Sequence, residues 1–403
     1  MENSQADYTT DATETQLQEE TKLQEIVEFI MPGKDKNLLK PEDLDQDAMQ
    51  ELKDLIPNLN SITLSGHSYG LDACKYIGDI IKDAPNLTKI NFSNSFIGKM
   101  KDEIPVNLAA LLQGLQGKQI THVDLSDNAF GPSGVPGFEE FLKKTPSIKV
   151  LKMINCGLGP FGTPELAKCL KEGNIQLDEL YAGRNRMECV GFQAISEYIK
   201  EVGTLKKVEL PQNFVKKEGM IALINALKNN KDLEYIHIHD NWLKEEAIKE
   251  FSVLLKSLSS LKSINISDCD IGGAGVKKII RGLGLSESKE TLQSFLCNYN
   301  EVERSKTVRF IFNVFSMCSV LNFISFYGNE FNEKLKKQYT EEYEKSKKTL
   351  VLKDPSIEED DEDEEDDEEI EDPSDEDEDE PDSEEETEDA QDLLKKFENL
   401  KIE

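Results

Sequence analysis

The sequence contains no run that approaches the roughly 18 consecutive apolar residues of a membrane-spanning helix. Its first twenty residues are polar and acidic, and they lack the apolar segment of a secretion signal. The seven cysteines are odd in number and none stands in a CxxC pair, which argues against a disulfide framework and a zinc module. We therefore expect a soluble intracellular protein with reduced thiols and no membrane partner.

The motifs of nucleotide-binding and hydrolytic enzymes are also absent. There is no phosphate loop of the form GxxxxGKS or GxxxxGKT, no HExxH and no GxSxG. His237, His239 and Asp240 bring three potential metal ligands together, but HxH pairs on strands often arise by chance, so no metal site is predicted. The sequence favours a binding protein with no cofactor of its own over an enzyme.

Positive charge is scarce, since 47 Lys and Arg face 80 Asp and Glu. Residues 358–389 hold 26 acidic residues and no basic one, so they account for all but −7 of the net charge of −33. Dense like charge with few apolar residues cannot form a core, which predicts a disordered acidic tail over 351–389. Because this charge repels phosphates, we expect no nucleic-acid partner.

What the sequence has in abundance is the motif LxxΦxΦxxNxΦ, where Φ is apolar. Ten copies, the looser ones included, start 28 to 33 residues apart. They begin at residues 59, 87, 120, 148, 177, 205, 233, 261, 292 and 321. The ΦxΦ segment has the period of a strand, and the second half of each unit has apolar residues at helical spacing. One strand and one helix cannot bury an apolar face alone, so the units must stack.

The repeat predicts an α/β leucine-rich-repeat solenoid, monomeric, with short parallel strands on the concave face and helices on the convex face. We expect a disordered segment over 1–20, a cap or degenerate repeat over 21–58, and repeats with a closing helix over 59–350. The tail over 351–389 and a short amphipathic segment over 390–403 follow. The ninth motif position, often Asn, should bind backbone amides that the turn leaves unpaired.

The residue before each ninth position is expected on the rim of the concave face. This row reads Gly66, Asn94, Asp127, Asn155, Arg184, Gln212, Asp240, Asp268, Tyr299 and Gly328. Its polar and varied character suits protein recognition, and the alternative is a solvated edge. The unit that starts at Leu87 is about five residues longer than its neighbours, with the excess in SFIGKMKDEIP. Loops on rigid scaffolds often carry function, although an insertion can also be merely tolerated.

Four stretches resemble the Ran GTPase-activating proteins: GKMKDEIP at 98–105, LSDNAFGP at 125–132, NCGLGP at 155–160 and GRNRME at 183–188. The resemblance covers roughly residues 25–345 and the acidic tail. It implies that the rim docks on GTP-bound Ran and speeds hydrolysis by orienting the GTPase's own glutamine, without an inserted arginine. GTP and magnesium would then be held by Ran, and a Ran-binding protein is a further candidate partner.

The resemblance also assigns roles to individual residues. Asn155 falls where the family has its key asparagine, and Asp127, Arg184 and Arg186 fall in motifs that resemble Ran contacts. Asn94, Lys101, Asp240 and Asp268 complete the predicted partner-binding set. Lys99 stands where the family has an arginine. Lysine keeps the charge but loses the planar, multi-donor geometry, and Lys101 is the candidate to compensate.

The chain turns apolar again at Leu394, Phe397, Leu400 and Ile402, with the spacing of a nuclear export signal. A short docking helix is the alternative interpretation. An export receptor would suit a GTPase activator that works in the cytoplasm, shuttles through the nucleus or acts near the nuclear envelope. No SUMO-accepting domain follows, so anchoring at the nuclear pore is not expected.

The second function class left open is an acidic leucine-rich-repeat binding module, such as a histone chaperone or an enzyme inhibitor. Ten copies with a period near 28 residues favour the activator or the ribonuclease-inhibitor type of array over shorter acidic histone-binding proteins.

Overall fold

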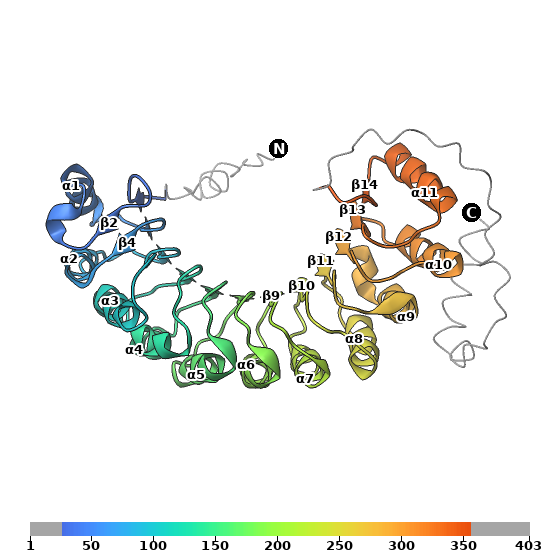
Figure 1. Cartoon of the computed structure of the whole chain (residues 1–403), viewed down its shortest axis with the longest axis horizontal. Coiled ribbons are helices and arrows are strands. Elements are labelled where there is room, and N and C mark those ends of the chain that lie inside the picture. The colour runs from blue at the N-terminus through green and yellow to red at the C-terminus, as the bar shows by residue number, and fades with distance from the viewer. Residues whose placement is uncertain (1–25, 356–403) are drawn as a thin grey trace, which may run out of the picture.

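The computed structural model describes residues 26–355, which form a curved solenoid. Within this range twelve strands make one parallel sheet along the inner side of the arc, with neighbours in chain order (Figure 1). The strands are β1 (Glu28–Ile30), β3 (Ser61–Thr63), β5 (Lys89–Asn91), β6 (His122–Asp124), β7 (Val150–Lys152), β8 (Glu179–Tyr181), β9 (Lys207–Glu209), β10 (Tyr235–His237), β11 (Ser263–Asn265), β12 (Ser294–Leu296), β13 (Phe323–Ser325) and β14 (Thr349–Val351). A second sheet pairs β2 (Asn37–Leu38) with β4 (Ser68–Tyr69).

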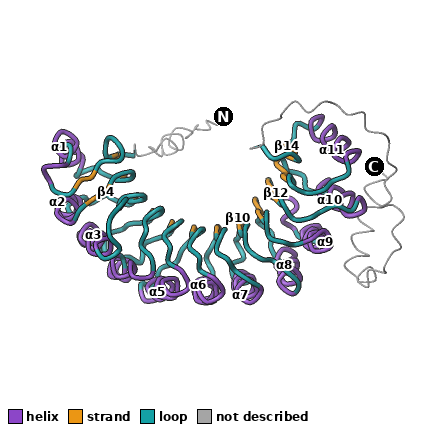
Figure 2. The backbone as a smooth tube through the Cα atoms, in the orientation of Figure 1, coloured by secondary structure: helices purple, strands orange, loops and turns teal. Residues whose placement is uncertain are grey.

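The helices lie on the outer side of the arc, as Figure 2 shows. They are α1 (Gln46–Leu55), α2 (Leu71–Ile81), α3 (Glu103–Leu112), α4 (Glu139–Lys144), α5 (Gly159–Glu172), α6 (Glu188–Val202), α7 (Lys217–Leu227), α8 (Glu246–Lys256), α9 (Gly272–Gly284), α10 (Ser305–Ser316) and α11 (Glu333–Lys345). Short 3-10 helices occur at Pro41–Asp43, Gln113–Leu115, Pro132–Gly137 and Glu287–Glu290. No helix in residues 26–355 is long and apolar enough to cross a membrane.

The strand register explains the core. The central residues of neighbouring strands are direct partners, for example Ile62 with Ile90 and Leu180 with Val208. Except for Leu350 of β14, these central side chains are at most 2 % exposed, and each contributes about 1.5–3 kcal/mol through burial. The flanking residues of each strand point to the opposite face, which is the concave surface. The solenoid predicted from the repeat is confirmed.

A ladder of buried asparagines joins the repeats, as the ninth motif position predicts. The side-chain oxygen of Asn185 accepts from the backbone N–H of Cys156 at 3.0 Å, and that of Asn213 accepts from Asn185 at 2.9 Å. Asn241 continues the series with the N–H of Asn213 at 3.1 Å. The side-chain nitrogens donate to backbone carbonyls, such as Asn213 to Leu210. Each asparagine thus satisfies backbone groups that the turns leave unpaired.

The array extends beyond the ten copies found in the sequence. β1 pairs in register with β3, and β14 pairs in register with β13. Val351, which was expected to begin the acidic tail, instead ends β14. The prediction was wrong at this boundary because the edge of β13 offers backbone partners to any extended segment, whatever its composition. α11 closes this end by burying Leu335, Tyr339 and Tyr343.

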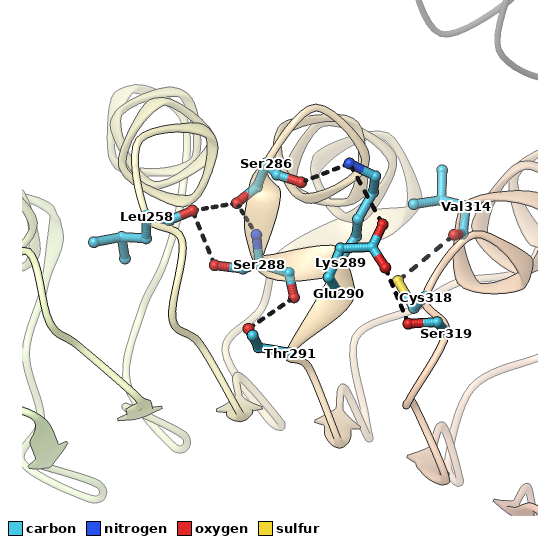
Figure 3. Close-up of polar contacts among 9 residues, drawn as sticks. All are labelled: Leu258, Ser286, Ser288, Lys289, Glu290, Thr291, Val314, Cys318 and Ser319. Atoms are coloured by element: carbon cyan, nitrogen blue, oxygen red, sulfur yellow. Dashed lines mark hydrogen bonds and ion pairs between the residues drawn. The ribbon is translucent and has the colours of Figure 1, made fainter. Parts of the chain in front are cut away.

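The unit between Leu261 and Leu292 is also longer than most of the others. Its extra residues follow α9, in the segment that leads to β12 (Figure 3). The hydroxyls of Ser286 and Ser288 both donate to the carbonyl of Leu258, which lies at the end of the preceding repeat. Glu290 then accepts from the hydroxyl of Ser319 at 3.0 Å, and so ties the insertion to the following repeat. The insertion is therefore pinned on both sides and leaves the concave sheet undisturbed.

Candidate protein-binding rim

Each of the first eleven strands of the large sheet, β1 to β13 in its order, is followed by a turn residue with left-handed backbone geometry. We call this row the rim: Asp35, Gly66, Asn94, Asp127, Asn155, Arg184, Gln212, Asp240, Asp268, Tyr299 and Gly328. Backbone hydrogen bonds link neighbours along it, such as Asn94 to Ser126 and Asp127 to Ile154, both at 2.8 Å. Because the strands are all parallel, these turns follow one edge of the concave sheet. The row read from the sequence is continuous in space and begins one repeat earlier, at Asp35.

Backbone conformation accounts for much of the polar character of the rim. Asn, Asp and Gly tolerate left-handed geometry, so Asn94, Asp127 and Asp240 have a structural reason to be there. Arg184, Gln212 and Tyr299 have no such structural reason. At φ values of 58°, 54° and 51° each of these three residues holds strain of about 1–3 kcal/mol. Sequence reasoning missed this distinction, because it depends on φ angles that a motif does not report.

Asn155 and Asp127 contact each other across neighbouring repeats. The Nδ2 atom of Asn155 donates to Oδ1 of Asp127 at 3.0 Å, and both side chains are exposed. This bond holds the amide so that its oxygen points away from Asp127. The backbone N–H of Asn155 is itself bound to the carbonyl of Gly183 at 2.9 Å. An exposed acceptor is thereby held in a fixed position on a rigid turn.

The next turn presents two arginines. Arg184 and Arg186 are exposed and flank Asn185, which is fully buried and donates to the carbonyl of Met153 at 2.6 Å. Arg186 and Glu188 are left-handed as well, with φ of 52° and 53°. The turns at 155–159 and 268–272 have the same three left-handed positions but place glycine at one or two of them, whereas this turn has no glycine at them. Strained residues of this kind concentrate at binding and catalytic sites.

The loop that lengthens the unit starting at Leu87 lies against the N-terminal segment. The Nζ atom of Lys99 donates to Oδ1 of Asn37 at 3.0 Å. A shallow cleft is lined by Asp35–Asn37, Ser68 and Ile97–Lys99. Lys101 is exposed two residues further on, just before α3 begins at Glu103. Sequence reasoning missed Asn37, because a contact across 62 positions leaves no local signal.

The predicted residues form one group and one separate pair. Asn94, Asp127, Asn155 and Arg184 occupy four successive repeats, whereas Asp240 and Asp268 lie beyond Gln212. Burial, together with the neighbouring Asp240 and Asp270, raises the pKa of Asp268. Along the rim, Arg184, together with the adjacent Arg186, thus forms a basic region, and Asp240 and Asp268 form an acidic region.

His237 has other partners than a metal. Its Nε2 atom lies 2.9 Å from the hydroxyl of Ser263, and its Nδ1 atom lies 3.5 Å from a carboxylate oxygen of Glu209. Burial, aided by the nearby His239 and Lys207, lowers the pKa of His237 to about 4. In residues 26–355 no three His, Cys, Asp or Glu side chains are grouped closely enough to hold a metal ion.

The concave face carries a feature that the sequence did not suggest. Lys207 lies with Nζ 4.1 Å from the ring centre of Tyr235 and 5.5 Å from that of Tyr181. Lys152 approaches the Tyr181 ring at 5.1 Å. These cation–π contacts hold long side chains across neighbouring strands.

The export-signal candidates Leu394, Phe397, Leu400 and Ile402 lie outside the described residues.

The fold and the asparagine ladder define a leucine-rich-repeat protein. The sequence family described as Leucine Rich repeat matches residues 120–135 and 257–279. The chain is also similar to Ran GTPase-activating proteins from several organisms, as its motifs had indicated.

The first of these relatives is Ran GTPase-activating protein 1 of Xenopus laevis, which is 38% identical over 183 residues, 42% of this chain and 32% of the relative. The Ran GTPase-activating protein of Drosophila melanogaster is 34% identical over 202 residues, 45% of this chain and 34% of the relative. Ran GTPase-activating protein 1 of Saccharomyces cerevisiae is 28% identical over 217 residues, 49% of this chain and 51% of the relative. The matches thus cover about a third to a half of the length of these curated relatives.

Proposed function

We propose that this chain is a GTPase-activating protein for Ran, which binds GTP-bound Ran on the rim and accelerates hydrolysis without chemistry of its own. The names of the relatives supply the partner. The observation that carries the proposal is the Asn155–Asp127 hydrogen bond beside the strained arginine turn. It puts an oriented amide and two positive charges on one rigid edge, where a protein partner can reach them.

The geometry supports a positioning mechanism. With its nitrogen bound to Asp127, Asn155 offers its oxygen as an acceptor to the amide N–H of a glutamine on the partner. That glutamine then keeps its own oxygen free to accept from the attacking water. Holding the glutamine in this orientation lowers the entropic barrier to hydrolysis. The GTP and its magnesium ion stay with the GTPase.

Other residues on the rim and beside it serve docking in this scheme. Arg184 and Arg186 contact acidic groups of the partner, and Lys99 anchors it near the N-terminal segment together with Lys101. Asn94, Asp240 and Asp268 complete the contact surface. The cellular role is regulation of nucleocytoplasmic transport, with the protein mainly in the cytoplasm and the C-terminal segment as an export signal.

Single-turnover GTP hydrolysis by Ran, with increasing amounts of this chain, tests the proposal. We expect the intact chain at saturation to accelerate hydrolysis by about 10³-fold or more. Asn155→Gly keeps the left-handed turn while it removes the amide, so it should abolish most of this acceleration without unfolding the turn. Asn313→Ala, at an exposed asparagine of α10, is the matched control and should behave like the unmodified chain.

A chain that does not accelerate hydrolysis at saturation would overturn the proposal. Full activity of Asn155→Gly would still support a GTPase activator, but it would refute the role of Asn155 in positioning the glutamine.

A further inference from the structure

Exposed apolar side chains follow the rim in four successive repeats. We call Phe161, Val190, Phe214 and Trp242 the apolar strip, and their exposed fractions are 76%, 55%, 57% and 39%. Phe161 and Val190 lie in the first turns of α5 and α6, and Phe214 and Trp242 lie in the turns that follow β9 and β10. A single exposed hydrophobic residue needs no explanation, but one per repeat along the same edge forms a surface.

Backbone hydrogen bonds place these turns side by side. The N–H of Gly159 is bound to the carbonyl of Asn185, and that of Glu188 to Asn213, at 2.8 Å and 3.0 Å. The N–H of Trp242 is bound to the carbonyl of Val215 at 2.9 Å. The strip therefore adjoins the arginine turn at its centre.

Folding does not explain the residue at position 214. Phe214 has φ of 55°, which is a genuine outlier for a bulky side chain. The equivalent turn positions in four other repeats are also left-handed and hold Gly157, Arg186, Asp270 and Glu301, whereas Trp242, at this position of the next repeat, is not left-handed. Asparagine or glycine would relieve the strain and remove apolar surface from water at once. An aromatic residue that is both strained and exposed points to a contact made outside the chain.

The neighbouring residues have the composition of an interface centre. The Nζ atom of Lys216 lies 5.7 Å from the ring centre of Trp242, a cation–π contact that helps to order the indole. Arginine and tryptophan are the residues on which binding energy concentrates in protein interfaces. Arg184 and Arg186 lie within the strip, in the repeat of Val190, whereas Asp268 and Asp270 lie in the repeat that follows Trp242.

We propose that the apolar strip is the surface that determines how tightly, and in which orientation, the GTPase docks. This inference rests on the proposed function and deepens it. The partner face that fits has apolar groups opposite the strip, carboxylates opposite Arg184 and Arg186, and basic groups opposite Asp268. The strip acts on affinity, whereas Asn155 acts on the rate of the bound complex, so the two contributions separate in kinetics.

The test compares the intact chain with Phe214→Asn in hydrolysis of GTP by Ran over a range of GTPase concentrations. We expect KM to rise at least tenfold while kcat stays within about twofold, because the strip contributes to docking alone. We also expect the melting temperature to stay equal or rise, because asparagine tolerates the left-handed turn. Val320→Asn, at a valine that is 45% exposed between α10 and β13, is the matched control with unchanged KM.

The outcomes separate the two proposals. No acceleration by the intact chain overturns the proposed function and the inference with it. Normal acceleration with an unchanged KM in Phe214→Asn overturns the inference alone. A drop in melting temperature with that variant assigns Phe214 a structural role and also overturns it. Sedimentation gives a further outcome that overturns the inference. If the intact chain is a dimer and the variant a monomer while their kinetics match, the strip binds a second copy of the chain and not the GTPase.

Discussion

The side-chain amide of Asn155 donates to the carboxylate of Asp127 across two neighbouring repeats, with 3.0 Å between Nδ2 and Oδ1. Both residues are left-handed, at φ of 53° and 58°, so each occupies a conformation that its side chain tolerates. Exposed pairs of this kind contribute little to stability. The main consequence of the contact is therefore the orientation of the amide.

Asp127→Ala tests that orientation. We expect a loss of about 1–3 kcal/mol in the free energy of unfolding, because alanine is strained at φ of 58°, whereas the lost hydrogen bond is exposed and adds little. The rate of Ran-bound GTP hydrolysis at saturation should fall about tenfold, because the amide of Asn155 is no longer held. Asp127→Asn, which keeps an acceptor at the same place, should recover much of the rate. Equal rates for the alanine variant and the intact chain would show that the contact does not matter.

Arg184→Asn separates strain from function. Relief of the left-handed strain at φ of 58° should raise the free energy of unfolding by up to about 1 kcal/mol. Docking should weaken, seen as a higher KM, because a charge-assisted contact is lost. Lys347→Asn relieves the same kind of strain, at φ of 56°, beyond the end of α11. This control should be stabilised with unchanged kinetics, and an unchanged KM in Arg184→Asn would remove the arginine from the site.

Lys99→Arg tests the departure from the family pattern. Arginine has the reach to keep the contact with Asn37 and adds planar donors for a carboxylate of the partner. We expect a lower KM for the GTPase, and a higher one in Lys99→Ala. Asn37→Ala is the accompanying variant, since it frees the lysine without removing its charge. A rise in KM on Lys99→Arg would mean that the Lys99–Asn37 hydrogen bond itself shapes the docking surface.

Asn213→Ala removes one rung of the ladder. Its side chain is fully buried, accepts from the N–H of Asn185 and donates to the carbonyls of Ala182 and Leu210. The variant leaves buried backbone groups unpaired, so we expect a loss of about 2–4 kcal/mol in urea unfolding. Asn225→Ala, at an exposed asparagine of α7, should stay within about 0.5 kcal/mol. Similar values for the two variants would contradict a stabilising ladder.

The pH dependence of stability tests His237. Burial lowers its pKa from the usual 6.5 to about 4, so the folded state keeps the imidazole neutral while the unfolded state takes up a proton. This residue's contribution to stability is complete above pH 6.5 and is lost as the pH falls toward 4. The free energy of unfolding of His237→Gln should therefore decline less over this window. Parallel pH profiles for the two proteins would show that His237 is accessible to protons in the folded state.

Much of the fold was readable because the repeat is local. Within one unit, the ΦxΦ pattern sets the strand and the apolar spacing sets the helix, so ten repeats could be placed without long-range information. β1 and β14 were not predicted, because their place in the sheet comes from pairing with a neighbouring strand. The candidate site was reached partly through the four motifs that resemble a family. Nothing local in the sequence indicated that Lys99 reaches Asn37 or that Phe214 is strained.

By itself, the sequence determined the period of the array, the buried asparagine ladder and the identity of the residues at each turn. These follow from side-chain polarity and spacing within about 28 residues. The tertiary structure decided which turns lie side by side, which backbones are left-handed and which aromatic residues stay in water. These properties depend on hydrogen bonds between repeats, and a contact such as Asn155 with Asp127 exists only after stacking has brought the two turns together.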